Sequence, residues 1–318
     1  MLQRVSVCEQ CQTESIVKKP NGEFVCAKCG HELNEAYFKQ IIDDSLALAE
    51  QNNTVAQFNL GFCYINGSGV VKDTVEGIRY YTLAAEAGDM YAQYRLGRCF
   101  EKELGVTMDN FEAVLWFRRA ADQGHSQAQY RLGTCYERGL GVVRDMNRAF
   151  NYYKSCAEQN NPFGQTALAR CYARGTGTGK NIAKALHYYK LAAEQDYAPA
   201  AYQLGAIYAD AVVVELNTNE ALFWFKKSAN KDYPPALTAL GLCYKDGKGV
   251  VKNEAKAVEY FKRAAHKGDG KAQYQLGVCY LNGCGVPFSI SEAMRWFGRA
   301  TENGVDEAIN FFKRKFKG

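Results

Sequence analysis

The sequence contains no long hydrophobic run. No window in its 318 residues approaches the roughly 18 uninterrupted apolar residues of a membrane-spanning helix. The opening residues, MLQRVSVCEQCQ, also lack the apolar stretch that a secretory signal peptide needs. Both absences predict a chain that does not insert into membranes and that works in the cytoplasm, with the nucleus as an alternative compartment.

Catalytic signatures are also missing. The chain has only four histidines, and three of them, His125, His187 and His266, share no metal-ligand spacing. There is no phosphate-binding loop, no G-x-S-x-G nucleophile motif and no H-E-x-x-H zinc motif. The sequence therefore predicts a protein without enzymatic activity.

Neither sign of charge dominates the composition. Lysine and arginine number 39 and the acidic residues 34, which gives a formal net charge of +5. This mild excess argues against a protein that coats polyanions along its whole surface, but it allows a local basic patch. Hydrophobic residues at 47% and charged residues at 23% are typical of a globular protein, so general disorder is not expected.

Three stretches of the chain are nearly identical. AQYRLGRCFEKELGV begins at Ala92, AQYRLGTCYERGLGV at Ala128 and AQYQLGVCYLNGCGV at Ala272, so the starts are separated by multiples of 36 residues. The same register gives full units that begin at Ala56, Ala92, Ala128, Gly164, Ala200, Ala236 and Ala272, and an eighth unit begins at Ala308. Self-similarity at this period predicts a solenoid of stacked supersecondary units.

The pattern inside each repeat predicts a pair of helices. The first segment carries apolar residues three and four positions apart, as one stripe of an amphipathic helix does. Glycine pairs such as Gly67 and Gly69 then end this helix, and capping residues such as Asp73 begin the second. Aromatic pairs in the second helix, followed one turn later by alanine pairs, predict a packed core between helices.

One further glycine recurs beside the apolar stripe of the first helix. Because glycine costs about 1 kcal/mol relative to alanine inside a helix, its repetition suggests that a neighbouring helix approaches too closely there for a side chain. The positions are Gly61, Gly97, Gly133, Gly205, Gly241 and Gly277.

The repeat reads A-x-x-x-L-G-x-x-Y-x-x-G-x-G-V-x-x-D-x-x-x-A-x-x-(W/Y)-(F/Y)-x-x-A-A-x-x-G, and it resembles the Sel-one-like repeat family, a relative of the tetratricopeptide repeats. The resemblance covers residues 56 to about 316 in seven full units. It implies a right-handed superhelix of antiparallel helix pairs whose first helices line the concave side. It also implies a role as an adaptor or scaffold in protein complexes, while hydrolase-like members of the family leave an enzyme as a further alternative.

Repeat five departs from this pattern. Where other repeats have the glycine pair, it reads ADAVVVEL from Ala209 to Leu216. Two structures are predicted as alternatives: a first helix that continues through this segment, or a loop that exposes an apolar ridge. A degenerate repeat and a partner contact are both consistent with the change.

Four cysteines near the N-terminus form a separate pattern. Cys8, Cys11, Cys26 and Cys29 read C-x2-C-x14-C-x2-C, which is typical of a tetrahedral structural zinc site. Apolar pairs at 16–17 and 24–25 flank a Pro-Asn-Gly turn at 20–22, so a β-hairpin is predicted to bring both cysteine pairs together. Four thiolates close the coordination shell, which predicts one structural zinc ion rather than a catalytic one; a redox pair or disulfide is the alternative.

The remaining cysteines belong to the repeats. Six of them occupy one position on the buried stripe, where a free cysteine behaves as a small hydrophobic residue: Cys63, Cys99, Cys135, Cys171, Cys243 and Cys279. Cys156 replaces a core alanine, and Cys284 lies in a loop. Cys284 is therefore the one thiol predicted to be exposed.

The residues that vary between repeats indicate a binding surface. The third, sixth and tenth positions after the opening alanine form a stripe opposite the core of the first helix. In repeats two to four this stripe is cationic, with Tyr94 and Tyr130 near it: Arg95, Arg98, Lys102, Arg131, Arg138, Arg170 and Arg174. Arginine suits bidentate recognition of carboxylate or phosphate, but pairing with local carboxylates such as Glu101 and Glu137 explains the stripe equally well.

Together these observations predict an all-α protein with a small β module in front of it. Residues 1–31 form a zinc ribbon, residues 32–55 a capping helix and linker, and residues 56–318 a solenoid of seven helix-pair repeats with a terminal helix from 308. The predicted function is a non-enzymatic adaptor that binds a protein or peptide, acidic or phosphorylated, in the concave groove. The alternative is a nucleic-acid-associated protein that uses the zinc ribbon and the basic stripe together.

Overall fold

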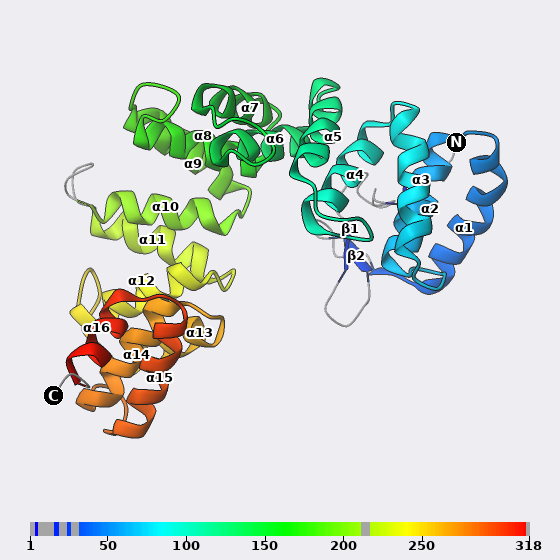
Figure 1. Cartoon of the computed structure of the whole chain (residues 1–318). Coiled ribbons are helices and arrows are strands. Elements are labelled where there is room, and N and C mark those ends of the chain that lie inside the picture. The colour runs from blue at the N-terminus through cyan, green and yellow to red at the C-terminus, as the bar shows by residue number, and fades with distance from the viewer. Residues whose placement is uncertain (1–3, 6–15, 19–23, 27–31, 211–216, 316–318) are drawn as a thin grey trace. The chain divides into compact units, whose positions relative to one another are not determined.

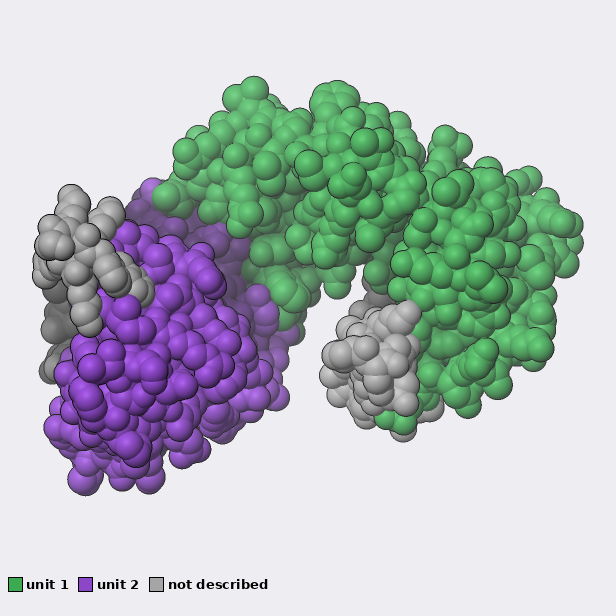
Figure 2. All heavy atoms as spheres, turned by 60° about the horizontal axis from the view of Figure 1, so that its bottom comes forward, with its two compact units in different colours: residues 1–164, 176–178 green, residues 165–175, 179–318 purple. Residues whose placement is uncertain are grey.

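The computed structural model describes residues 4–5, 16–18, 24–26, 32–210 and 217–315, with the backbone alone at 16–18, 26 and 312–315 (Figure 1). The described part is predominantly helical, as predicted. It divides into two compact units (Figure 2). Unit 1 comprises Met1–Gly164 with Thr176–Thr178, and unit 2 comprises Gln165–Gly175 with Gly179–Gly318.

Helices alternate along the chain as first and second members of each repeat. The first helices are α2 (Thr54–Asn66), α4 (Met90–Lys102), α6 (Ser126–Arg138), α8 (Pro162–Arg174), α10 (Ala198–Tyr208), α12 (Pro234–Asp246), α14 (Gly270–Asn282) and α16 (Asp306–Lys315). The second helices are α3 (Thr74–Glu86), α5 (Asn110–Asp122), α7 (Met146–Glu158), α9 (Ile182–Glu194), α11 (Thr218–Ala229), α13 (Glu254–His266) and α15 (Ile290–Glu302). All first helices begin 36 residues apart, which confirms the period and the helix-pair unit.

The helix boundaries follow the predicted capping chemistry. Asp73 and Asp109 accept hydrogen bonds from the first backbone N–H groups of α3 and α5. Gly67 ends α2 in the left-handed conformation with φ of 65°, which glycine adopts without steric cost. In repeat two Glu103 occupies the corresponding position with φ of 56°, so the same turn forms there without glycine.

The close approach predicted at the recurring glycine is confirmed. The second residue of each aromatic pair is buried and lies against the glycine of the preceding first helix: Tyr81, Phe117, Tyr153, Phe225, Phe261 and Phe297. A Cβ atom added to the glycine would lie between 2.4 and 2.8 Å from this ring in all six repeats that carry it. The aromatic stripe is therefore part of the core, and the absence of a side chain at the glycine leaves room for each ring.

The repeat cysteines are also part of the core. Cys63, Cys99, Cys135, Cys171 and Cys279 are buried, and Cys243 is half-buried. Burial raises the pKa of the Cys63 thiol to about 12 and that of Cys279 to about 11, so these thiols stay protonated near neutral pH. Cys284 is half-buried in its loop rather than fully exposed.

A recurring glutamine, which was not among the residues predicted to be important, holds repeats two, three, four and seven together. Gln93 donates through Nε2 to the carbonyl of Ala85, 3.0 Å away, and accepts from Gln123 at 2.8 Å. The same side-chain pair, also at 2.8 Å, recurs at Gln129 with Gln159, at Gln165 with Gln195 and at Gln273 with Asn303. Repeats five and six have Ala201 and Leu237 at the glutamine position.

Ion pairs occur where the glutamine is absent. Asp196 lies 3.1 Å from Lys231 and 3.6 Å from Lys227, and Asp232 lies 2.7 Å from Arg263. The hydrogen bond from Lys231 holds the pKa of Asp196 below its usual range. In repeats five and six, an exposed ion pair therefore takes the place of the buried glutamine side chain. It connects the loop before the first helix with the second helix of the repeat.

A small sheet and one helix precede the repeats. The sheet is antiparallel with the order β1 (Ile16–Lys18), β2 (Phe24–Cys26), β3 (Glu32–Leu33), and Ile16 lies opposite Cys26. The strands β1 and β2 are those predicted on either side of the turn. Helix α1 (Glu35–Glu50) begins later than the predicted start at Glu32, because β3 pairs with β2 and Asn34 caps the helix.

Helix α1 packs against α2, as expected of a helix that covers the first repeat. Its buried face contains Phe38, Ile41, Ile42 and Ala49. The apolar pattern of the helix also predicts Leu46 on this face, and that prediction is wrong: Leu46 is 42% exposed, and the face passes through Ser45 instead. In repeat five, α10 ends at Tyr208, so the first helix does not continue; residues 211–216 of the irregular segment lie outside the described residues.

Candidate peptide-binding face of the first helices

The cationic stripe of unit 1 lies on two consecutive first helices. We define it by Arg95, Arg98 and Lys102 on α4 and by Arg131 and Arg138 on α6. Lys102 and Arg138, in the last turn of each helix, are exposed, and the other three are half-buried. The positions opposite the core therefore present cations that reach solvent along both helices.

Glu101 joins the two helices of the stripe. Arg98 Nε lies 2.9 Å from Glu101 Oε2, and Arg131 Nη1 lies 3.3 Å from Glu101 Oε1. Local pairing, which the sequence left open, thus occurs at Arg98 and Arg131. The other carboxylate considered, Glu137, accepts a hydrogen bond from the Tyr153 hydroxyl at 2.6 Å. Because a guanidinium has five N–H donors, Arg98 and Arg131 keep donors for a further acceptor.

Tyr94 lies in the core and not on the predicted binding surface. Its side chain is 5% exposed, its ring stacks on His125 with centroids 4.6 Å apart, and its hydroxyl accepts from Arg98 Nη1 at 3.1 Å. The residue two positions after the opening alanine points toward the next repeat, which explains the difference. Tyr130 is half-buried, and the Arg131 guanidinium lies 6.0 Å from its ring centroid.

Two cations of the stripe have no acidic partner among the described residues: Lys102 and Arg138. The two remaining predicted cations lie on α8 in unit 2, where Arg170 is half-buried and Arg174 is exposed. Five of the seven predicted cations therefore lie on α4 and α6 in unit 1, and the other two lie on α8 in unit 2.

In repeat one the same stripe is covered. Its positions are Asn59, Phe62 and Asn66, and Asn59 is fully buried while Phe62 is 4% exposed. The Phe62 ring packs against Phe24 of β2 and Phe38 of α1, with centroids 5.8 and 6.4 Å apart. The sequence carried one signal for this contact: Phe62 stands at the position that Arg98 occupies in repeat two.

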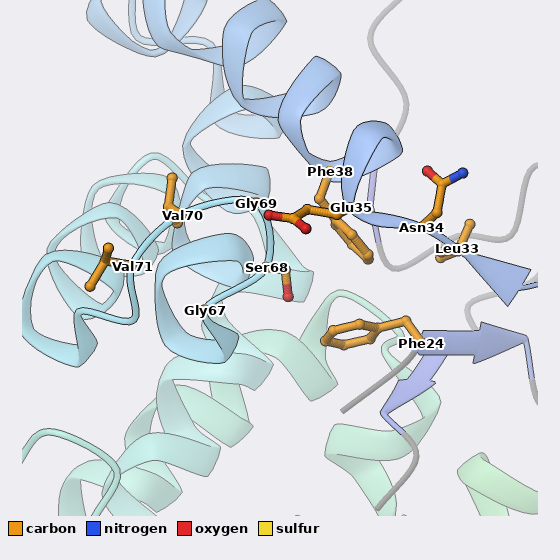
Figure 3. A pocket seen from close by; sticks show the side chains of 10 residues that line it. All are labelled: Phe24, Leu33, Asn34, Glu35, Phe38, Gly67, Ser68, Gly69, Val70 and Val71. Atoms are coloured by element: carbon orange, nitrogen blue, oxygen red, sulfur yellow. The ribbon is translucent and has the colours of Figure 1, made fainter. Parts of the chain in front are cut away.

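An open cavity of about 720 Å³ lies beside this contact (Figure 3). It is lined by Phe24 and Leu33 of the sheet, by the start of α1, and by the loop 67–71 that follows α2. The rings of Phe24 and Phe38 and the side chain of Ser68 converge on it (Figure 3). The cavity belongs to the junction between repeat one and the N-terminal module, which consists of the sheet β1–β3 and helix α1.

The predicted zinc ligands are not tested by the structure. Cys8, Cys11 and Cys29 lie outside the described residues, and Cys26 ends β2 with only its backbone described. The zinc site therefore stays a prediction.

His125 caps α6 next to the cationic stripe. Its Nδ1 accepts from the backbone N–H of Ala128 at 3.2 Å, which requires an unprotonated nitrogen there. Burial, with Arg95 as the second cause, lowers the pKa of His125 from 6.5 to about 4. The residue is 5% exposed, so the neutral form is part of the folded state.

Acidification is expected to destabilise this cap. Between pH 6.5 and pH 4, His125 binds a proton in the unfolded chain but not in the folded one. The free energy of unfolding therefore keeps its full value above pH 6.5 and falls by up to about 3 kcal/mol toward pH 4. His125→Asn should remove this component and keep the cap, because Asn53 caps α2 at the same repeat position. Urea unfolding of both chains at pH 7 and pH 4.5 measures the difference; equal pH dependence would contradict it.

Helix pairs repeated every 36 residues define an α/α repeat protein of the tetratricopeptide-like kind, a fold typical of protein-interaction scaffolds. The chain belongs to the Sel1 repeat family: the Sel1 repeat pattern matches residues 54–89, 91–125, 126–161, 162–197, 198–233, 234–269 and 270–305. These matches confirm the seven repeats. They do not extend to the N-terminal module.

Solved structures show the same fold. The chain is 30% identical to c5321, a protective antigen of uropathogenic Escherichia coli with an SLR fold, with a TM-score of 0.72 over 84% of this chain and 57% of that one. It therefore spans little more than half of that antigen. A Sel1 repeat protein from Oxalobacter formigenes is also 30% identical, with a TM-score of 0.70 over 89% and 82% of the two chains. Yeast Tom70, at 14% identity and a TM-score of 0.51, shares the fold alone, over 88% of this chain and 59% of its own.

No curated protein matches the sequence. Among the described residues, no helix combines the length and the apolar character needed to cross a membrane.

Proposed function

We propose that this chain is a non-enzymatic adaptor that holds an acidic or phosphorylated segment of a protein partner against the cationic stripe. The observation that carries the proposal is that α4 and α6 each carry one cation without an acidic partner and one arginine held by Glu101. Lys102 and Arg138 are exposed and have no acidic partner among the described residues, and Glu101 fixes Arg98 and Arg131 on the same two helices.

A fixed arginine loses little side-chain entropy when a ligand arrives, which favours binding. Each arginine held by Glu101 can direct its remaining N–H groups to a carboxylate or phosphate oxygen, and such charge-assisted contacts are stronger than neutral ones. The neutral and apolar residues at the same positions of unit 2, such as Gln203, Leu242 and Val278, limit this chemistry to the repeats that carry cations.

The test uses labelled twelve-residue peptides of one length on the full chain: glutamate-rich, phosphoserine-containing, glutamine-rich and lysine-rich. Binding by the first two and not by the last two is expected, with at least a tenfold loss in the double variant Arg95→Glu/Arg131→Glu. The matched control reverses two cations of second helices, Lys154→Glu/Lys262→Glu, and is expected to bind unchanged. Equal losses in both variants would mean that net charge alone attracts the peptide.

A single-stranded oligonucleotide of twelve residues separates this proposal from the nucleic-acid alternative. Affinity for nucleic acid that exceeds affinity for the acidic peptides, and that falls steeply with salt concentration, would replace the adaptor proposal. Retention of the acidic peptides in the presence of excess oligonucleotide would support it.

A further inference from the structure

A two-residue segment of the chain's own N-terminus lies on the first helices of repeats one and two. Val5 is fully buried, and its backbone N–H donates to Asn59 Oδ1 at 2.8 Å. Asn59 lies on α2, 54 residues away in sequence, and is itself fully buried. A hydrogen bond from a backbone N–H to a buried side-chain amide holds a peptide segment by its backbone, without reading its side chains.

The side chain of Arg4 is held by two different kinds of contact. Its guanidinium pairs with the carboxylate of Asp89, whose side chain is 2% exposed. It also lies over the ring of Tyr91, with the guanidinium carbon 4.4 Å from the ring centroid. Burial strengthens the ion pair relative to an exposed one, and the aromatic face selects a planar cation.

The two carboxylate oxygens of Asp89 have different partners. Oδ1 accepts from the backbone N–H groups of Tyr91 and Ala92 and so caps α4, while Oδ2 faces Arg4. The capping bonds fix the orientation of the carboxylate before any ligand is bound. The arginine site is therefore preorganised by the helix that carries it.

The segment lies on the face that carries the cationic stripe in later repeats. Asn59 occupies the third position after the opening alanine, where repeats two and three have the half-buried Arg95 and Arg131. The combination of an acidic cap with a tyrosine two residues later occurs once, since Asp269 at the same repeat position is followed by Lys271. The site is thus specific to the junction of repeats one and two.

We propose that Asn59, Asp89 and Tyr91 form a subsite for a peptide segment in which arginine is followed by a small aliphatic residue, and that Arg4–Val5 is its intramolecular ligand. An external segment of the same chemistry binds when the chain's own residues leave. The ligand is opposite in charge to that of the cationic stripe, so this subsite does not depend on the proposed function. The chain's N-terminus thereby regulates access to it.

The experiment vacates the subsite in the full chain with Arg4→Gln and measures binding of a fluorescein-labelled peptide, LQRVS. We expect at least tenfold tighter binding to this variant than to the wild-type chain, whose own arginine occupies the site. The peptides LQQVS and LQKVS are the ligand controls, and both are expected to bind at least tenfold more weakly than LQRVS. A second variant, Val5→Gly, loosens the intramolecular segment from its buried end and is expected to increase binding as well.

Asp89→Asn provides the critical protein variant, because asparagine keeps the cap of α4 while removing the charge. In the Arg4→Gln background, Asp89→Asn should abolish LQRVS binding, while the matched Asp269→Asn should leave it intact. Equal binding to wild-type and Arg4→Gln chains, or binding that survives Asp89→Asn, would overturn the proposal. Binding of the glutamate-rich peptide should be the same in all these variants, so failure of the proposed function is detected separately.

Discussion

Replacing Gly277 by alanine is expected to destabilise unit 2, although alanine is the better helix former. The new Cβ would lie 2.7 Å from two carbons of the Phe297 ring, closer than real Cβ contacts allow. Phe297 is fully buried, so the ring cannot move aside without disturbing its neighbours. Overpacking of this kind costs about 1–3 kcal/mol and should exceed the gain in helix propensity.

Gly298→Ala in the same repeat is the matched control. Gly298 lies in α15 with no neighbouring atom within 4 Å of the added Cβ, so only the propensity gain remains. Alanine there should raise the free energy of unfolding by about 0.5–1 kcal/mol. Urea unfolding of the two full-length variants should therefore shift in opposite directions. Stabilisation by both substitutions would show that the helices can separate at Gly277.

The repeat architecture could be predicted because the seven repeats of the chain can be aligned with one another. Seven copies show which positions stay apolar, small or aromatic, and a recurring glycine such as Gly133 has meaning only when its five counterparts are visible. The positions of helix ends followed for the same reason, since Gly67 and Asp73 have counterparts in other repeats. Period and packing therefore came directly from the sequence.

The contacts that break the repeat could not be predicted in the same way. Glu101 pairs with Arg98 and Arg131 because α4 and α6 lie side by side, and no periodicity distinguishes this from a solvated row of charges. Likewise nothing in the pattern places Arg4 against Asp89, which is 85 residues away. The Arg4 contact depends on where the residues before repeat one lie, and those residues have no second copy in the chain.

The N-terminal module and repeat one share a single core, which links the predicted zinc site to the repeats. Phe24 and Leu33 of the sheet are buried together with Phe38 of α1 and Phe62 of α2. A sheet of strands two and three residues long cannot supply such a core by itself. What stabilises the sheet is therefore expected to stabilise the first turns of the solenoid as well.

We propose that one zinc ion, held by Cys8, Cys11, Cys26 and Cys29, supplies this stability. Because β1 and β2 are antiparallel with Ile16 opposite Cys26, the chain enters β1 and leaves β2 at the same end of the hairpin, which supports the proposal. Metal binding is worth about 10–16 kcal/mol in small zinc peptides, far more than so small a sheet gains from packing. Elemental analysis of the full chain should find one zinc per molecule.

Cys26→Ser is expected to lose the zinc, and Cys284→Ser, the matched control in a repeat loop, is expected to keep it. Removal of the metal by a chelator should increase hydrogen exchange in α1 and α2, because Phe38 and Phe62 lose their contacts with Phe24. Exchange in α13 and α15 of unit 2 should not change. A chain that carries no zinc would contradict the proposal and favour the redox alternative for these cysteines. A zinc-bearing chain whose α1 and α2 amides stay protected after chelation would contradict the stabilising role of the metal.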